Sequence, residues 1–242
     1  CIGNDGQMLS DALQDSQVHL DFLKTLDMPT GHALIQVSQT GQNCIILFGG
    51  ANQAISREQI DETLSHFDQG DILLLQNEIN LVPYIMEKAA ERGLAIAFNA
   101  SPFPGVETYP LSLVRWLFVN EIEGGAISGE TEPQAILRAL RAKFPKTEVI
   151  LTLGSDGSLW ANDRETAFCP ACHVQAVDTT GAGDSFNGGL CTALSEGADM
   201  KTALQFANCT GALSVTKHGA ASAAPFRAEI LALMKKTYGT EL

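Results

Sequence analysis

Along most of the chain, short runs of consecutive apolar residues alternate with stretches in which apolar residues recur every three or four positions. The runs have the length of strands, and the recurring pattern is that of amphipathic helices. Four buried strands are predicted, over Asp71–Gln76, Leu94–Phe98, Trp116–Val119 and Glu148–Leu153. Buried strands that alternate with helices form βαβ units. The pattern therefore predicts an α/β fold with a doubly wound, mostly parallel sheet and helices on both faces.

The predicted helices carry signals at their ends. Ser56 is a predicted N-cap, with Gln59 completing a capping box, and Thr131 is expected to cap the helix that has Pro133 in its first turn. Another helix starts at Asn80 and is expected to stop at Gly93. Further helices are predicted over Asp5–Ser16, Leu111–Arg115, Asp184–Glu196, Met200–Thr216 and Phe226–Lys236.

Two regions predict β-structure outside this alternation. The runs His32–Ser38 and Asn43–Phe48 flank Gln39–Gln42, which predicts a hairpin with Thr-Gly in its turn and a small, partial β lid over about residues 32–50. Later short strands are predicted over Ser158–Ala161, Thr166–Phe168 and His173–Val177. The chain shows no repeat and no linker, so residues 1–242 are predicted to form a single domain.

Composition limits the partners that the protein can have. Its 15 Lys and Arg against 28 Asp and Glu give a net charge of −13. Such a charge repels phosphate backbones and anionic lipid, which argues against nucleic acid or a membrane as partner. Apolar runs also stay far below the ~18 residues of a membrane span.

The six scattered cysteines predict reduced thiols and a cytoplasmic location. Cys169 and Cys172 form a C-x-x-C pair, but the chain has no second pair. We interpret this one as incidental.

The strongest chemical signal runs from Val177 to Gly189, between a predicted strand and a predicted helix. Gly181 and Gly183 remove side chains where the helix begins, so backbone N–H groups can converge at the positive end of its dipole. This predicts an anion hole for a phosphoryl group, with Asp184 placed to accept a proton from an attacking hydroxyl. The alternative is a glycine-rich turn that Asp184 merely caps.

Two glycines inside the same helix, Gly188 and Gly189, favour the functional interpretation. Each costs about 1 kcal/mol against alanine, which indicates close approach of a backbone or a ligand. Other phosphate and catalytic motifs are absent from the sequence. It contains no G-x-x-x-x-G-K-[ST], G-x-G-x-x-G, G-x-S-x-G or H-E-x-x-H.

Residues 178–189 resemble the signature of the ribokinase-like, phosphofructokinase-B-type carbohydrate kinases. The resemblance continues in order along the chain, through Cys1–Asp5, Gly49–Asn52, Leu74–Glu78, Asn120–Glu123, Thr152–Gly157 and Val215–Ala220. It implies a kinase that transfers the γ-phosphate of ATP to a primary hydroxyl of a sugar, with ribose as the favoured acceptor. A fructokinase, a ketodeoxygluconate kinase, a nucleoside kinase or a non-catalytic nucleotide-binding protein are the alternatives.

The resemblance also implies roles for individual residues. Asp184 would be the catalytic base, and Gly181, Ala182 and Gly183 would form the anion hole. The nucleotide would contact Asn120, Thr152, Gly154 and Asn208, and the sugar would contact Glu78, Asp184 and Asn187. Asn120 and Glu123 would hold Mg²⁺ through water, the alternative being a solvated helix start. A K⁺ site would be formed, largely by backbone carbonyls, at Asp178, Thr180, Ser214, Lys217 and Gly219.

Relative to this family, the sequence starts late. The family's first sheet strand, a sugar-binding Asp and a glycine-rich loop would precede Cys1, so the resemblance implies an N-terminally truncated domain. We expect such a chain to bind ATP or ADP but to phosphorylate sugar weakly. A full-length form would be a homodimer through the lid.

Overall fold

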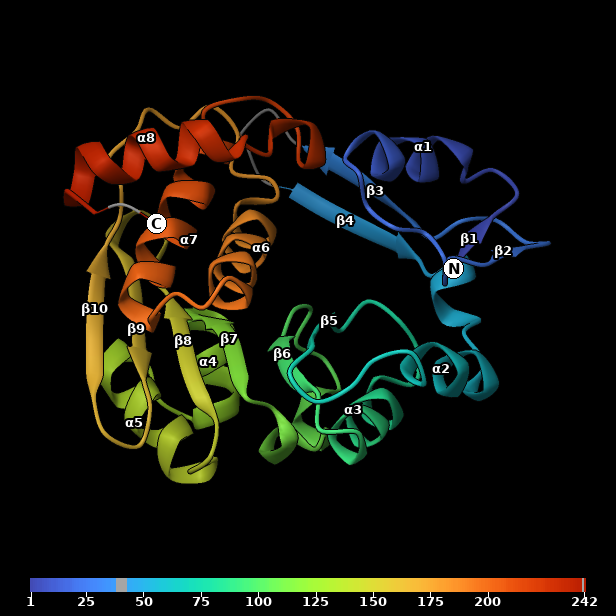
Figure 1. Ribbon diagram of the computed structural model, residues 1–242, viewed down its shortest axis with the longest axis horizontal. Coiled ribbons are helices and arrows are strands. Elements are labelled where there is room, and N and C mark those ends of the chain that lie inside the picture. Colours follow the sequence, from blue (N-terminus) through green and yellow to red (C-terminus); the bar gives the residue numbers. More distant parts are fainter. Residues whose placement is uncertain (38–42, 241) are drawn as a thin grey trace.

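The computed structural model describes residues 1–37, 43–240 and 242. At its centre is a six-stranded sheet with the order β10–β9–β8–β7–β6–β5 (Figure 1). The parallel strands are β5 (Ile72–Gln76), β6 (Ala95–Asn99), β7 (Trp116–Asn120) and β8 (Glu148–Thr152). β9 (Gly157–Ala161) and β10 (Thr166–Pro170) are antiparallel to their neighbours. The predicted α/β fold with a mostly parallel sheet is confirmed.

Both faces of this sheet are buried. In β7, Leu117 and Val119 pack into one core while Trp116 and Phe118 pack into the other, as expected when successive side chains point to opposite faces. The first core is closed by α2 (Arg57–Leu64), α3 (Val82–Glu91), α4 (Glu121–Ser128) and α5 (Pro133–Lys143). The second is closed by α6 (Ala182–Ser195), α7 (Met200–Ser214) and α8 (Arg227–Tyr238).

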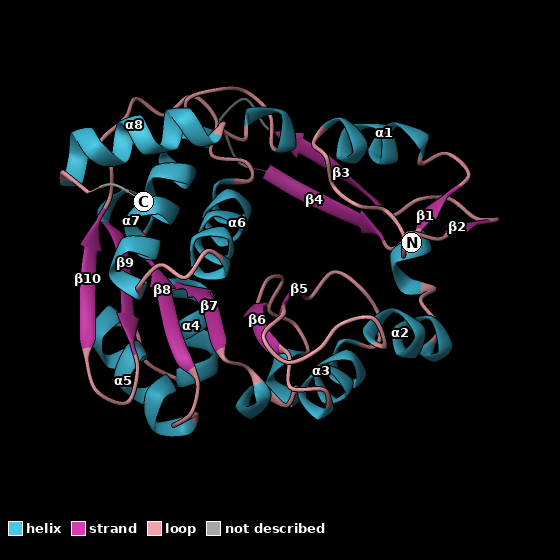
Figure 2. Cartoon of the chain, viewed as in Figure 1, coloured by secondary structure: helices cyan, strands magenta, loops and turns pink. Residues whose placement is uncertain are grey.

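The N-terminal part lies beside this three-layer body. β1 (Ile2–Gly3) pairs in parallel with β2 (Thr25–Leu26), and α1 (Gln7–Asp15) lies between them in sequence. The predicted hairpin is present as β3 (His32–Val37) and β4 (Asn43–Phe48), and Figure 2 shows it apart from the main sheet. Its predicted Thr-Gly turn lies outside the described residues. No helix in the described part of the chain is long and apolar enough to cross a membrane.

Several predicted helix ends need correction. Ser56 Oγ does accept the N–H of Gln59 at 3.2 Å, but the Gln59 side chain accepts the Cys1 thiol instead of completing the box. The cap of α5 falls on Glu132 and not on Thr131, because Pro133 takes the first helical position.

Asn80 does not start α3, contrary to the prediction. Its side-chain amide accepts the N–H of Ile55 and donates to the Ile55 C=O, and α3 begins after Leu81. The predicted helix over Leu111–Arg115 is a 3₁₀ turn of three residues, Leu111–Leu113. The predicted strand over His173–Val177 is absent. After Pro170 the chain leaves β10 and reaches the end of α7, where the N–H groups of Val177 and Asp178 both donate to Val215 O.

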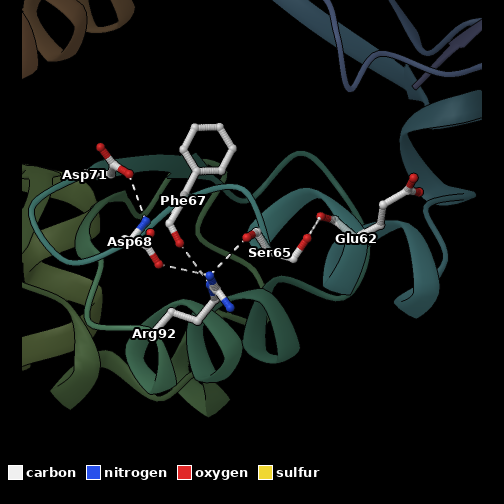
Figure 3. A network of polar contacts seen from close by, with 6 residues as sticks. All are labelled: Glu62, Ser65, Phe67, Asp68, Asp71 and Arg92. Carbon is white, nitrogen blue, oxygen red and sulfur yellow. Dashed lines mark hydrogen bonds and ion pairs between the residues drawn. The ribbon is translucent and has the colours of Figure 1, made fainter.

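The loop that leads into β5 is held by one guanidinium group (Figure 3). Arg92, at the end of α3, donates from Nε to Phe67 O at 2.9 Å and from Nη2 to Ser65 O and Asp68 Oδ1, both at 3.1 Å. Asp71 closes the same loop by accepting the N–H of Asp68 at 2.9 Å. These bonds satisfy backbone carbonyls at the end of α2 and fix the entry of β5, the strand that reaches the candidate site.

The paired glycines of α6 have different surroundings. A Cβ on Gly189 would lie 2.6 Å from Thr210 Oγ1 and 3.0 Å from Thr210 Cβ, so α6 and α7 approach closely there. A Cβ on Gly188 would meet nothing within 4 Å. Close approach of another part of the protein is therefore found at Gly189, whereas approach of a ligand to Gly188 stays a prediction.

This difference predicts opposite effects of the same substitution. Gly189→Ala overpacks the α6–α7 contact, and we expect it to lower the free energy of unfolding by about 1–3 kcal/mol. Gly188→Ala removes a helix-interior glycine without a clash, and we expect it to raise that free energy by about 1 kcal/mol. Urea unfolding of both variants measures the two changes. Equal midpoints for the two variants would contradict the close approach.

Candidate active site

Several predicted site residues lie where parallel strands end. Asn120 is the last residue of β7, Thr152 is the last of β8, and the two are register partners. Gln76 ends β5, and Glu78 follows it by two positions. Because the carboxyl ends of parallel strands share one edge of the sheet, these side chains come to the edge where ligands of open α/β sheets bind.

The turn before α6 requires glycine at position 181. Gly181 is the N-cap residue in the left-handed region, with φ 74° and ψ 8°. A Cβ on it would also lie 3.1 Å from the Cβ and 3.2 Å from the Cα of Ala220. Both the backbone conformation and the contact therefore disfavour a side chain at this position, where the helix begins.

Two N–H groups in the first turn of α6, those of Gly183 and Asp184, are positioned to bind an anion. Ala182 donates its N–H back to Thr179 O at 3.3 Å, and Ser185 donates to Gly181 O at 2.9 Å. Gly183 and Asp184 lie between them, where a helix offers its N–H groups no internal acceptor. A Cβ on Gly183 would meet nothing within 4 Å, so the space beside these N–H groups is open. The anion hole stays a prediction, and within the first turn of α6 the N–H groups of Gly183 and Asp184 are the ones positioned for it.

Asp184 is exposed in the first turn of α6 and is held by a residue distant in sequence. Gln76 Nε2 donates to Asp184 Oδ1 at 2.5 Å, across 108 positions of the chain. This bond orients the carboxylate and leaves its second oxygen available to a substrate. Gln76 lies in the segment Leu74–Glu78 that resembles the family, but it is not among the predicted site residues. No local sequence signal reveals a contact over this separation.

Glu78 lies close enough to Asp184 for the two charges to interact. Its side chain still reaches solvent, but partial burial raises the pKa of the Glu78 carboxyl, and the negative charge of Asp184 raises it further. The Gln76 amide and the Asp184 carboxylate are in contact beside the start of α6, and the Glu78 carboxyl lies within range of their charges. Such a cluster can accept a proton and bind hydroxyl groups.

Asp178 ties the loop before α6 to the loop after α7. Its Oδ1 accepts the N–H of Thr180 and its Oδ2 accepts the N–H of Gly219, each at 3.0 Å. These bonds, led by the one from Gly219, lower the pKa of the Asp178 carboxyl to about 2. The structure thereby brings together three of the residues predicted for a monovalent cation.

The other two predicted cation residues direct their side chains elsewhere. Ser214 is buried and its Oγ donates to Gly211 O at 2.8 Å. The Lys217 ammonium pairs with Glu229 at 3.3 Å. The side chains of these two residues are therefore engaged elsewhere, and the monovalent-cation site stays a prediction.

A cavity of about 330 Å³ adjoins the α6 turn. Its lining includes Thr152, Gly154, Ala182, Gly183 and Asn208, so three of the four predicted nucleotide contacts and two of the three predicted anion-hole residues share it. Asn120 is not among its lining residues in the described part of the chain. A second hollow of about 530 Å³ includes Gly181 and Asp184 in its wall. The turn before α6 therefore separates two spaces.

Asn208 has a structural role that its sequence position did not reveal. Its Nδ2 donates to Cys169 O at 3.1 Å and to Pro170 O at 3.4 Å, and the residue is 7% exposed. The amide thus fastens the end of β10 to α7. A contact with a nucleotide base stays a prediction, in addition to this role.

Asn120 and Glu123 form a reciprocal capping box at the start of α4. Asn120 Oδ1 accepts the N–H of Glu123, and Glu123 Oε2 accepts the N–H of Asn120, both at 2.9 Å. Glu123 is only 7% exposed, so the alternative of a solvated helix start is wrong for this residue. The box still leaves the second carboxylate oxygen of Glu123 outside the cap.

Asn187, predicted to touch the sugar, is 4% exposed. Its Nδ2 is buried and has no acceptor among the described residues. A sugar contact stays a prediction, and this conformation gives it no exposed nitrogen to use. An unpaired buried amide costs about 1–3 kcal/mol.

The chain is similar in sequence and in structure to known carbohydrate kinases. The model of the pfkB family carbohydrate kinases matches residues 1–227. Ribokinase of Haemophilus influenzae is 32% identical, over 97% of this chain and 80% of that protein. The crystal structure of Thermotoga maritima ribokinase superposes with a TM-score of 0.85 at 38% identity, over 97% of this chain and 80% of that one. Arabidopsis thaliana ribokinase, solved in complex with ribose and ATP, gives 0.84 and 30% over the same shares.

The proximity of Asp184 to Glu78 can be measured without any substrate. Asp184→Asn removes a negative charge that raises the pKa of Glu78, so we expect this pKa to fall, though not fully, because the burial remains. NMR titration of the Glu78 carboxyl measures it. Asp163→Asn, an equal change of charge in the exposed turn before β10, is the matched control and should leave the pKa unchanged. The same titration curve in all three proteins would contradict the proximity.

Proposed function

Because the chain belongs to the pfkB family of carbohydrate kinases, we propose that it transfers the γ-phosphoryl group of ATP to the primary hydroxyl of ribose. Family membership makes the protein a phosphotransferase that acts on a carbohydrate. Ribose is supported by the similarity to ribokinases, one of which was solved with ribose and ATP. The observation that carries the proposal is the meeting of Asp184, Gln76 and Glu78 beside the open first turn of α6.

Asp184 is the proposed general base. One of its oxygens is held by Gln76, so the other is the free acceptor for the proton of the attacking hydroxyl. A positioned base of this kind contributes typically ~100–10,000-fold to the rate. Glu78 is the proposed partner for a second sugar hydroxyl, because its carboxyl is close enough to Asp184 for the two charges to interact.

The proposed site of the transferring phosphoryl group is the backbone of Gly181, Ala182 and Gly183. Negative charge spreads over the oxygens of that group during transfer, and catalysis consists mostly of positioning and charge stabilisation. N–H groups fixed at the positive end of α6 supply this stabilisation without reorganisation. Ala182 and Gly183 also line the 330 Å³ cavity, so a nucleotide bound there would point its phosphates at this turn.

The remainder of ATP is proposed to occupy the 330 Å³ cavity, against Thr152, Gly154 and Asn208. Asn120 is the register partner of Thr152 in the neighbouring strand. It is proposed to lie near the phosphates of the bound ATP. Sugar and nucleotide would then meet from opposite sides of the turn before α6, since Asp184 is in the wall of the other hollow.

Mg²⁺ is proposed to accompany the nucleotide, near Asn120 and Glu123. Within the described residues no group of three or more His, Cys, Asp or Glu could hold a metal ion. The capping box uses one oxygen of each residue, so a single carboxylate oxygen remains. This set fits a Mg²⁺ that keeps its waters and the phosphates of ATP as ligands. When bound, it neutralises phosphate charge.

K⁺ is proposed at the two loops that Asp178 joins. That side chain holds the N–H groups of Thr180 and Gly219, so the carbonyls of the same loops have fixed positions. Carbonyl oxygens fit a monovalent cation, whose charge would support the neighbouring turn at Gly181.

A second copy of the chain is the proposed partner of the β3–β4 hairpin, which exposes Leu34, Leu47 and Phe48.

An acceptor panel tests the proposed function. ADP release is followed with ribose, fructose, ketodeoxygluconate or a nucleoside present, at protein concentrations near that of ATP so that slow transfer is counted. We expect ribose to give the fastest release. Calorimetric titration with ADP runs beside it. Nucleotide binding without acceptor-dependent release would contradict the kinase and favour a nucleotide-binding protein.

Asp184→Asn is the decisive variant in that assay. We expect transfer to fall by ~100–10,000-fold while ADP affinity stays nearly unchanged, because the base acts on the acceptor and not on the nucleotide. Asp163→Asn is again the control with an equal change of charge. Near-full turnover by Asp184→Asn would reduce this residue to a helix cap.

Glu123→Gln tests the metal role without breaking α4, because glutamine also completes a capping box. Loss of one charge-assisted hydrogen bond costs about 1.5–3 kcal/mol. We therefore expect the Mg²⁺ concentration for half-maximal rate to rise by about tenfold or more. Glu121→Gln changes an exposed residue of the same helix turn and should leave it unchanged. Matching Mg²⁺ titrations for the two variants would remove Glu123 from the metal site.

A further inference from the structure

Three buried cysteines lie close together at the 330 Å³ cavity, and one of them, Cys172, lines it. Cys169 lies in β10, the strand at one edge of the sheet. Cys172 lies in the segment that follows this strand, and Cys209 lies within α7. All three are buried, at 5%, 4% and 0% exposure. The closest pair is not the C-x-x-C pair. Cys172 Sγ lies 3.0 Å from Cys209 Sγ, across 37 positions of the chain.

The backbone around this pair is already fastened. Asn208 Nδ2 donates to Cys169 O, and the Tyr238 hydroxyl donates to Pro170 O at 2.5 Å. Both bonds hold the segment of Cys172 against α7 and α8. A disulfide has an S–S distance of about 2.05 Å, so the two sulfurs need to approach by only about 1 Å. Small side-chain rotations suffice for this, and the surrounding bonds can stay in place.

Cys172 is also the member that a small reagent can reach. It is a lining residue of the 330 Å³ cavity, whereas Cys209 is fully buried behind it. The hydrogen bond from Cys209 lowers the pKa of the Cys172 thiol to about 6, and the same contact raises the pKa of Cys209. Thiolate character and access are what make a cysteine oxidisable.

We propose that Cys172 and Cys209 form an oxidisable thiol pair in the wall of the cavity, which a peroxide joins into a disulfide. The Cys172 thiolate attacks one peroxide oxygen, the O–O bond breaks, and a sulfenic acid and hydroxide form. The Cys209 sulfur then attacks the Cys172 sulfur, the S–O bond breaks, and water leaves with the Cys209 proton. In total, two thiols and one peroxide give one disulfide and two waters.

Nucleotide and peroxide compete in this arrangement, and this part of the inference rests on the proposed function. A nucleotide that fills the cavity covers Cys172. If only the empty protein reacts, ADP at 100 times its Kd leaves about one molecule in a hundred open. The rate of disulfide formation should then fall by about 100-fold.

Peptide mapping after treatment with hydrogen peroxide tests the pair. Trypsin releases residues 165–201, which contain Cys172, and residues 202–217, which contain Cys209. We expect these peptides to be joined under non-reducing conditions and separated by a reductant. Cys172→Ser and Cys209→Ala should each abolish the link. Cys169→Ala and Cys191→Ala, which change the other cysteines of the first peptide, should both retain it.

Two results would overturn the inference. One is a link that needs Cys169 or Cys191 in place of Cys172, and the other is no link in the unsubstituted protein. A link that forms at the same rate with saturating ADP would overturn the route through the cavity. Calorimetry on the same sample separates the proposals. If ADP does not bind, the proposed function fails, and the thiol pair is still decided by the link alone.

Discussion

The start of α6 depends on one backbone constraint, the left-handed conformation of Gly181 in contact with Ala220. A side chain at 181 would strain the backbone and strike Ala220, so the turn, the loop after α7 and the helix axis are fixed together. Asp178 reinforces the same junction through two backbone N–H groups. The direction of the first-turn N–H groups, and the place of Asp184 beside them, follow from this junction.

The sheet brings the second half of the site to the first. β5 enters from a loop that Arg92 fastens, and it ends at Gln76, whose amide reaches Asp184. On the other side, the ends of β7 and β8 bring Asn120 and Thr152 together in register. α6 and α7 approach closely at Gly189, and Asn208 of α7 both lines the cavity and fastens the end of β10.

Local patterns predicted the fold well, because alternation of side chains in β7 and helical stripes such as that of α5 are set by neighbours in sequence. Gly181 likewise indicated the turn before α6 through its left-handed backbone, but its contact with Ala220 could not be read from the local sequence. Competition between local signals produced the errors. Pro133 moved the cap from Thr131 to Glu132, and Asn80 bonded Ile55 in place of a helix. Contacts over long separations, Gln76 with Asp184 and Cys172 with Cys209, have no local signature at all.

The central claim is that Asp184 and the N–H groups of the α6 turn act on one phosphoryl transfer to a primary hydroxyl. ³¹P NMR of the protein with MgATP and ribose tests it most directly, because a phosphate ester on a primary carbon couples to two methylene protons. We expect the γ-phosphate signal to be replaced by such a triplet, with an equal amount of ADP. Release of inorganic phosphate, or an ester on a ring hydroxyl with coupling to a single proton, would contradict the claim.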